Sequence, residues 1–195
     1  MTKPIQDRTR ATRARLIATA EDIIATKGYA ALRVEEVVQT AGVAKGTFFA
    51  HFAGKDGLME LMIGARIDAF LDEAETWPAP QTVNDLVTHM MPLIHIMTSE
   101  RYVFDVILRH SGAAAREEIG AIARTFTRQV EVVARWLSNS PFRKDISDHL
   151  LADGIQAFAT QTMALHFCAI NNSETMQDRL RIYLDAWLNP RSTVA

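Results

Sequence analysis

The chain has 195 residues, of which 48% are hydrophobic and 23% are charged, and its formal net charge is −2. This balance is typical of an ordinary globular protein, and the length suffices for one or two small domains with a sizeable core. The single cysteine, Cys168, excludes an intramolecular disulfide and a cysteine-based zinc site. No apolar signal-like start and no apolar run near the ~18 residues of a membrane span occur, so we expect a cytoplasmic protein without membrane contact.

The charged residues are distributed unevenly along the chain. Residues 1–57 hold nine Lys or Arg and six Asp or Glu, whereas residues 58–195 hold twelve and seventeen. A basic N-terminal end on an acidic body is typical of a protein that contacts phosphate at one end only.

The N-terminal end is predicted to be an arm followed by a helix. Residues 1–8 are expected to form a mobile arm, in which Lys3 and Arg8 either contact phosphates or are simply solvated. Residues 9–27 have the apolar period of a helix, and Gly28 closes it.

Residues 34–55, VEEVVQTAGVAKGTFFAHFAGK, carry the most informative pattern. Val34, Val37, Val38 and Ala41 share one face of a short helix, and Gly42 ends it, because glycine adopts positive φ at little cost. Residues 45–51 then form a second short helix. Two helices joined by a short glycine-bearing turn are the helix-turn-helix unit, whose second helix enters the DNA major groove.

The remaining residues also show helical periodicity, and we see no strand. A long helix is expected over residues 55–75, followed by a Trp-Pro-Ala-Pro linker, and Pro92 is expected to kink or split a helix over 82–98. Further helices are predicted over 100–110, 115–139 and 145–170, with a loop over 111–115 between the first two. A last helix, capped by Ser173, should end at Leu188.

The motif at residues 34–55 resembles the DNA-binding signature of the tetracycline-repressor (TetR-type) family of bacterial transcription regulators. The resemblance runs from about Thr12 to Leu58. Three departures stand out: Ala44 replaces a frequent serine and removes a hydroxyl N-cap, Phe49 replaces a usual tyrosine, and Leu32-Arg33 replaces the usual Thr or Ser.

The resemblance implies an all-α fold with two domains. Residues 1–57 would form a three-helix DNA-binding domain with the helix-turn-helix, and residues 58–195 a helical domain for effector binding and dimerisation. The expected function is a dimeric transcriptional regulator, a repressor that a small molecule releases from a palindromic operator. No cofactor, metal or enzymatic activity is expected.

Candidate DNA contacts follow from this unit. Lys45 could read a guanine edge and Thr47 a thymine methyl or a phosphate, whereas Phe49, His51 and Lys55 should position the backbone. Phe48 and Phe52 are expected in the core. The full candidate set is Arg10, Thr12, Arg13, Val34, Lys45, Gly46, Thr47, Phe49, Ala50, His51 and Lys55.

The helical body should hold the effector pocket and the dimer interface. An apolar and aromatic lining with sparse polar groups is expected for the pocket, although each residue also fits a plain core: Met91, His95, Phe104, Phe126, Phe158, Thr162 and His166. The helix over 145–170 is apolar nearly all round, which favours a four-helix dimer interface, with a monomeric core as the alternative. The candidate interface residues are Phe158, Leu165, Leu180, Leu184 and Trp187.

Two alternative functions remain open. A transcriptional activator of the same architecture fits the sequence equally well. A helical small-molecule binder or enzyme without DNA binding is the other alternative, but no Glu-x-x-His, His-x-x-x-His or glycine-rich phosphate loop occurs.

Overall fold

The computed structural model describes residues 3–111, 119–168, 170 and 173–189. These residues contain helices and no strand, which confirms the predicted all-α fold class. The helices are α1 (Lys3–Lys27), α2 (Val34–Thr40), α3 (Lys45–His51), α4 (Lys55–Ala74), α5 (Val83–Met97), α6 (Arg101–His110), α7 (Ala121–Ser138), α8 (Asp148–His166) and α9 (Met176–Leu188).

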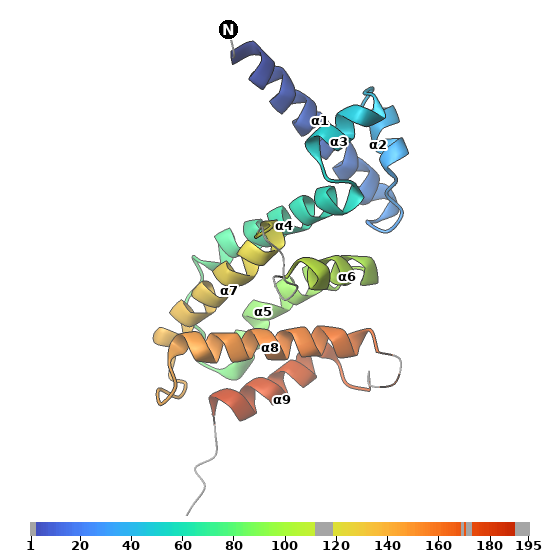
Figure 1. Ribbon diagram of the computed structural model, residues 1–195. Helices are drawn as coiled ribbons and strands as arrows, with labels where there is room; N and C mark the ends of the chain where they lie inside the picture. Colours follow the sequence, from blue (N-terminus) through green and yellow to red (C-terminus); the bar gives the residue numbers. More distant parts are fainter. Residues whose placement is uncertain (1–2, 112–118, 169, 171–172, 190–195) are drawn as a thin grey trace, which may run out of the picture.

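The helices gather at two ends of an elongated molecule (Figure 1). Helices α1–α3 lie at one end, α5–α9 lie at the other, and α4 runs between them. The N-terminal half of α1 projects beyond α2 and α3 into solvent. The division of the molecule into two ends therefore follows the distribution of charge along the chain: the basic N-terminal helices are separated from the acidic body.

A small apolar core holds the first three helices together. Leu16 of α1, Leu32 before α2 and Phe48 of α3 are fully buried. Gly42 has φ +63° and ends α2 as predicted, since only glycine adopts this conformation without strain. The core fixes the angle between α2 and α3.

Helices α4 and α7 are joined by apolar packing and by an ion cluster. Ile63 and Ile67 of α4 are almost fully buried. The Arg128 guanidinium of α7 lies 3.2 Å from Asp68 and 2.5 Å from Asp72 of α4, and 3.0 Å from Glu75, which caps the C-terminal end of α4. Since one guanidinium contacts three acids, the cluster sets the rotation of α4 against α7.

The mobile arm predicted for the N-terminus is wrong, and so is the split that was one of the two outcomes predicted for Pro92. The arm predicted over 1–8 is helical from Lys3, and residues 1 and 2 lie outside the described part of the chain. Helix α5 is not split at Pro92, because its apolar side is buried and Pro92 is exposed, where solvent can bond the carbonyl left free. A kink at Pro92 stays a prediction.

The C-terminal helices are shorter than predicted. Helix α7 begins at Ala121, whereas residues 112–118, where the predicted loop and helix start meet, lie outside the described residues. Helix α8 ends at His166 instead of residue 170. The cap of α9 is Thr175 instead of Ser173, because the Thr175 hydroxyl accepts the backbone N–H of Asp178.

A search for membrane-spanning segments over the described residues finds no helix that combines the necessary length with sufficient apolarity.

The capping box of α5 gives a stability prediction. The Thr82 hydroxyl accepts the Asp85 N–H at 3.1 Å, and the Asp85 carboxylate accepts the Thr82 N–H at 2.9 Å. Thr82→Ala should cost about 1 kcal/mol of unfolding free energy and lower the melting temperature by roughly 2–4 °C. Melting at fixed protein concentration measures this. Thr88→Ala, at an exposed site of the same helix, should change it less, and equal losses would show that the cap is not the cause.

Candidate nucleic-acid interface and effector pockets

Helix α3 presents a continuous polar and aromatic face to solvent. Lys45, Gly46, Phe49 and Ala50 are exposed, and the Phe49 ring is 52% exposed although it contacts Phe48 edge-on. Thr47 and His51 are half-buried. Helix α3 therefore has the geometry of a recognition helix, with its other face anchored by Phe48.

Both short helices begin without a side-chain cap. Arg33 before α2 and Ala44 before α3 have extended backbone, but neither side chain accepts a hydrogen bond from the following turn. The predicted loss of hydroxyl caps is confirmed. The two helices depend on their shared core instead of on local capping.

Lys45 forms an ion pair with Glu35 of α2. Its ammonium lies 2.6 Å from Glu35 Oε1, and both side chains are more than half exposed. The hydrogen bond from Lys45 is the main reason why the pKa of Glu35 lies below its usual value. Because the pair is exposed and screened by solvent, Lys45 can exchange Glu35 for another acceptor, but Glu35 also places a negative charge beside any bound phosphate.

The candidate contacts on α1 differ in exposure. Arg10 is exposed, whereas Thr12 and Arg13 are half-buried. The Arg13 guanidinium lies 5.1 Å from the centroid of the buried Phe52 ring, a cation–π contact that holds Arg13 against the base of α3. Val34, at the start of α2, is partly buried against the core.

Lys55 is turned toward the helical body. Its ammonium donates to the carbonyl of Ala30 at 3.2 Å and lies 4.5 Å from the centroid of the Tyr102 ring of α6. Burial, followed by the nearby charge of Arg33, lowers the pKa of Lys55. Contact with a phosphate would therefore compete with these two interactions.

The residues predicted to line one effector pocket lie in different places. Met91, His95 and His166 line an open pocket of about 510 Å³ beside the start of α9. Phe104 is buried and stacks on Phe167, with ring centroids 5.6 Å apart. Phe158 packs on Tyr183 and Trp187, and Thr162 is buried with its hydroxyl unpartnered within the described structure.

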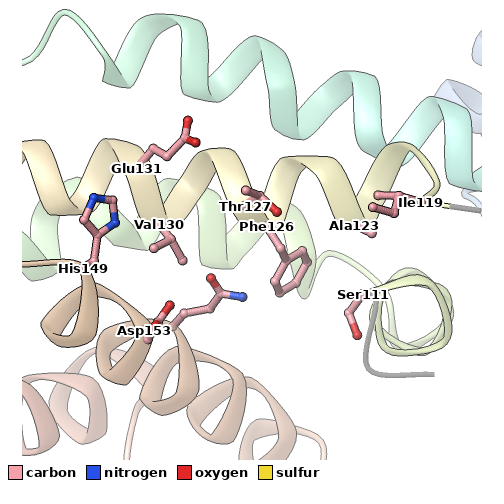
Figure 2. A pocket seen from close by; sticks show the side chains of 10 residues that line it. Ser111, Ile119, Ala123, Phe126, Thr127, Val130, Glu131, His149 and Asp153 are labelled. Carbon is pink, nitrogen blue, oxygen red and sulfur yellow. The ribbon is translucent and has the colours of Figure 1, made fainter. Parts of the chain in front are cut away.

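A second open groove, of about 500 Å³, lies between α7 and α8 (Figure 2). The Phe126 ring and Val130 extend from α7 toward α8, and His149 rises from α8 on the opposite side (Figure 2). Of the predicted pocket residues, only Phe126 lines this groove. Its size is within the range of small-molecule sites.

Sequence reasoning missed two glutamines, one in the wall of this groove and both in the wall of a neighbouring void. Gln156 lines the groove, and Gln129 and Gln156 both line a small enclosed void behind it. The Oε1 atoms of both are buried without a hydrogen-bond partner among the described residues. The available signal was the position of Gln129 on the apolar stripe of α7, three residues after Phe126 and four before Val133.

The candidate dimer residues divide into an inner and an outer set. Leu180 and Leu184 are fully buried within the protomer, so neither can contact a partner, and their assignment to the interface is corrected. They occupy the inner stripe of α9, which packs on α5 and α8. Phe158, Leu165 and Trp187 are partly exposed.

An outer face of α8 and α9 remains uncovered within the protomer. It contains Leu150, Ala157 and Ala164 of α8 with Ile182 and Ala186 of α9, all exposed. These positions repeat at helical spacing, and Leu150 and Ile182 are 55% and 48% exposed. Such an exposed apolar stripe favours packing against a pair of helices from a partner subunit.

No set of three His, Cys, Asp or Glu side chains within the described ranges is arranged to hold a metal ion.

Comparison with known families gives a match for the first four helices. Residues 16–62 match the family described as "Bacterial regulatory proteins, tetR family". The HTH-type transcriptional regulator YdeS of Bacillus subtilis (strain 168) is 28% identical over 110 residues, which cover 54% of this chain and 47% of YdeS. TcmR of Streptomyces glaucescens is 36% identical over 74 residues, which cover 38% of this chain and 33% of TcmR. The matches thus span less than half of these relatives.

Solved structures extend the similarity of fold to most of the chain. Thermus thermophilus FadR, a repressor solved with lauroyl-CoA, has a TM-score of 0.63 at 14% identity, covering 90% of this chain and 92% of FadR. The SmeT–triclosan complex has a TM-score of 0.58 at 19% identity, covering 91% and 90%. At these identities the likeness establishes the fold alone.

The Lys45–Glu35 pair gives a prediction for nucleic-acid binding. Glu35→Gln should raise the affinity for duplex DNA severalfold at low salt, because it frees Lys45 and removes a negative charge beside the recognition helix. Fluorescence anisotropy with a labelled duplex measures the change. Glu36→Gln is the matched control, because Glu36 pairs with Lys27 of α1. Weaker binding by Glu35→Gln would mean that the pair positions Lys45.

Proposed function

We propose that this chain, whose residues 16–62 match the tetR family of bacterial regulatory proteins, is a dimeric transcriptional repressor that leaves a palindromic operator when a small molecule binds. The proposal divides the chain into a DNA-binding domain, residues 1–57, and an effector-binding and dimerisation domain, residues 58–195. It includes a cytoplasmic location and no catalytic role.

The exposed face of α3 carries the DNA-binding part of the proposal. Lys45 and Ala50 are exposed, while Phe48 is fully buried and anchors α3 in the core. A helix held in this way by a helix-turn-helix enters the major groove, where its first residues reach base edges. Lys45 and Thr47 are proposed to read bases. Gly46, Phe49, Ala50 and His51 lie along the same contact surface.

Residues outside α3 are proposed to position the phosphate backbone. Arg10, Thr12 and Arg13 lie on α1, and Val34 begins α2, so its backbone N–H can approach a phosphate. Lys55 stays in the proposed set, although it must exchange its contacts with Ala30 and Tyr102.

Dimerisation is proposed to occur through the outer face of α8 and α9. One helix-turn-helix reads only a few base pairs, so a two-fold symmetric pair is needed to double the site. The two recognition helices must then lie about one DNA turn, ~34–36 Å, or a multiple of it apart. The apolar outer stripe supplies the self-complementary surface that such symmetry requires.

The effector part of the proposal is supported by the open pockets of the body and by the structural neighbours. Thermus thermophilus FadR was solved with lauroyl-CoA, and SmeT with triclosan. These two molecules are chemically unlike, so they support a small-molecule effector without specifying its class. The physical requirement is that the effector binds more tightly to the arrangement that does not fit DNA.

The DNA-binding proposal predicts a sequence-selective, salt-dependent interaction. Selection from a genomic library with the full chain should enrich a palindrome, and affinity should fall steeply with salt, because neutralised phosphates release counterions. Lys45→Ala should change the preferred base, whereas Arg10→Ala should weaken all duplexes alike. If no genomic sequence exceeds random duplex at physiological salt, the proposal fails.

The dimer proposal predicts the effect of a single charge. Ala157→Arg places a cation in the middle of the outer stripe of α8 without removing a contact inside the protomer. Sedimentation should show a shift from dimer to monomer, with a loss of operator affinity of at least about tenfold. Ala25→Arg, on an exposed site of α1, is the matched control for association. A wild-type monomer, or a dimer unaffected by Ala157→Arg, would contradict the proposed interface.

A further inference from the structure

The open groove between α7 and α8 and the enclosed void behind it share two wall residues. Phe126 and Gln156 line both spaces. The void measures about 10 Å³, which is about the space of one water molecule. The groove is open to solvent and large enough for a small organic molecule. The Phe126 ring and the Gln156 side chain therefore belong to the wall that the two spaces share.

The wall of the void can yield to a ligand. Met90 and Met97 of α5 and Met163 of α8 line it together with Phe126. Methionine side chains are unbranched and adapt their shape at low cost, and their sulfur atoms make favourable contacts with aromatic rings. The void can therefore enlarge around an inserted group without breaking a rigid contact.

Gln129 provides a polar point inside this apolar space. Its side chain is only 6% exposed, and its Oε1 atom has no hydrogen-bond partner in the described structure. Gln156 Oε1 is buried and unpartnered in the same void. A buried carbonyl oxygen without a donor is unfavourable, so both amides favour a ligand that brings an O–H or N–H group to them.

The charges around the two spaces oppose an anion. Among the residues that the structure describes, no ionisable side chain lines the void, and no Lys or Arg lines either space. The groove itself carries Glu131, Asp153 and His149. A carboxylate or phosphate placed here would lose hydration and would lie in a groove that carries the carboxylates of Glu131 and Asp153.

We propose that the effector site is this groove together with the void behind it, and that it takes a neutral, mostly apolar molecule whose hydroxyl group donates to Gln129. The apolar body of the ligand occupies the groove beside Phe126 and Val130, and the hydroxyl reaches the void. This inference rests on the proposed ligand-responsive function, since it names the ligand class and the site that the function requires.

The test uses three probes with one biphenyl body. They are 4-phenylphenol, biphenyl and biphenyl-4-carboxylate, titrated into the full chain by isothermal calorimetry. The wild-type protein should bind 4-phenylphenol about tenfold more tightly than biphenyl, the value of one neutral hydrogen bond, and should bind the carboxylate most weakly. A carboxylate bound as tightly as the phenol, or no binding of the phenol, overturns the inference.

The variant that isolates the hydrogen bond is Gln129→Leu. Leucine keeps an apolar side chain of similar size and removes the buried amide, so the unliganded variant should melt no lower than the wild type. Its preference for 4-phenylphenol over biphenyl should fall to about twofold or less, with biphenyl binding retained. Gln177→Leu is the matched control, because Gln177 lines the separate pocket beside His166. An unchanged preference in Gln129→Leu, or an equal loss in Gln177→Leu, overturns the assignment.

Operator binding separates this inference from the proposed function. Each protein is also titrated with the duplex selected from the genomic library. Operator binding without a hydroxyl preference rejects the ligand class and leaves the repressor intact. A hydroxyl preference without duplex binding supports the site and rejects the repressor.

Discussion

The packing of α4 is the constraint on which the rest of the structure depends. Helix α4 has 20 residues and is about 30 Å long, and it carries α1–α3 at one end while the body packs along its length. Met59 and Ile67 lie in the buried core, so the helix cannot slide without opening it. Arg128 adds a rotational constraint, because it contacts two acids of α4 and the acid that caps its C-terminal end. The orientation of the DNA-reading unit is thus tied to the position of α7.

A second connection fixes the same unit from α6. Both carboxylate oxygens of Glu100, just before α6, accept backbone N–H groups, from Tyr29 at 2.7 Å and from Ala30 at 3.0 Å. Gly28 has φ +81°, and a Cβ there would lie 2.7 Å from Glu100 Oε1, so the turn after α1 requires glycine for both conformation and space. The hydrogen bonds of Glu100 and the contact between Lys55 and Tyr102 hold the turn after α1 against the body. This attachment lies away from the axis of α4. Two separate attachments make the reading unit follow the body as one piece.

Local sequence signals predicted the DNA-binding end well and the body less well. The bounds of α3, the turn at Gly42 and the buried Phe48 follow from short-range rules, so the sequence contained them. The ion pair between Lys45 and Glu35 joins two helices, and no spacing rule indicates it. In α9 the periodicity found the stripe with Leu180 and Leu184, but a stripe does not say whether it faces its own core or a partner. The residues that line pockets were harder still to predict from the sequence, because pockets and the core are lined by the same apolar and aromatic residue types.

The neighbouring positions 128 and 129 connect the ligand-binding proposal with the constraint on α4. Arg128 points to the acids of α4, and Gln129, the next residue of α7, lines the enclosed void. Successive helical residues are rigidly related, since each backbone step rotates by about 100°. A group that enters the void and bonds Gln129 therefore acts on the same turn of α7 that holds α4 by its guanidinium. Displacement of that turn changes the geometry of the three ion pairs of Arg128 at once. Packed interfaces of this kind switch between discrete arrangements and do not deform continuously. Gln129, the group proposed to bond the ligand, thus lies directly beside Arg128, which contacts the acids of α4.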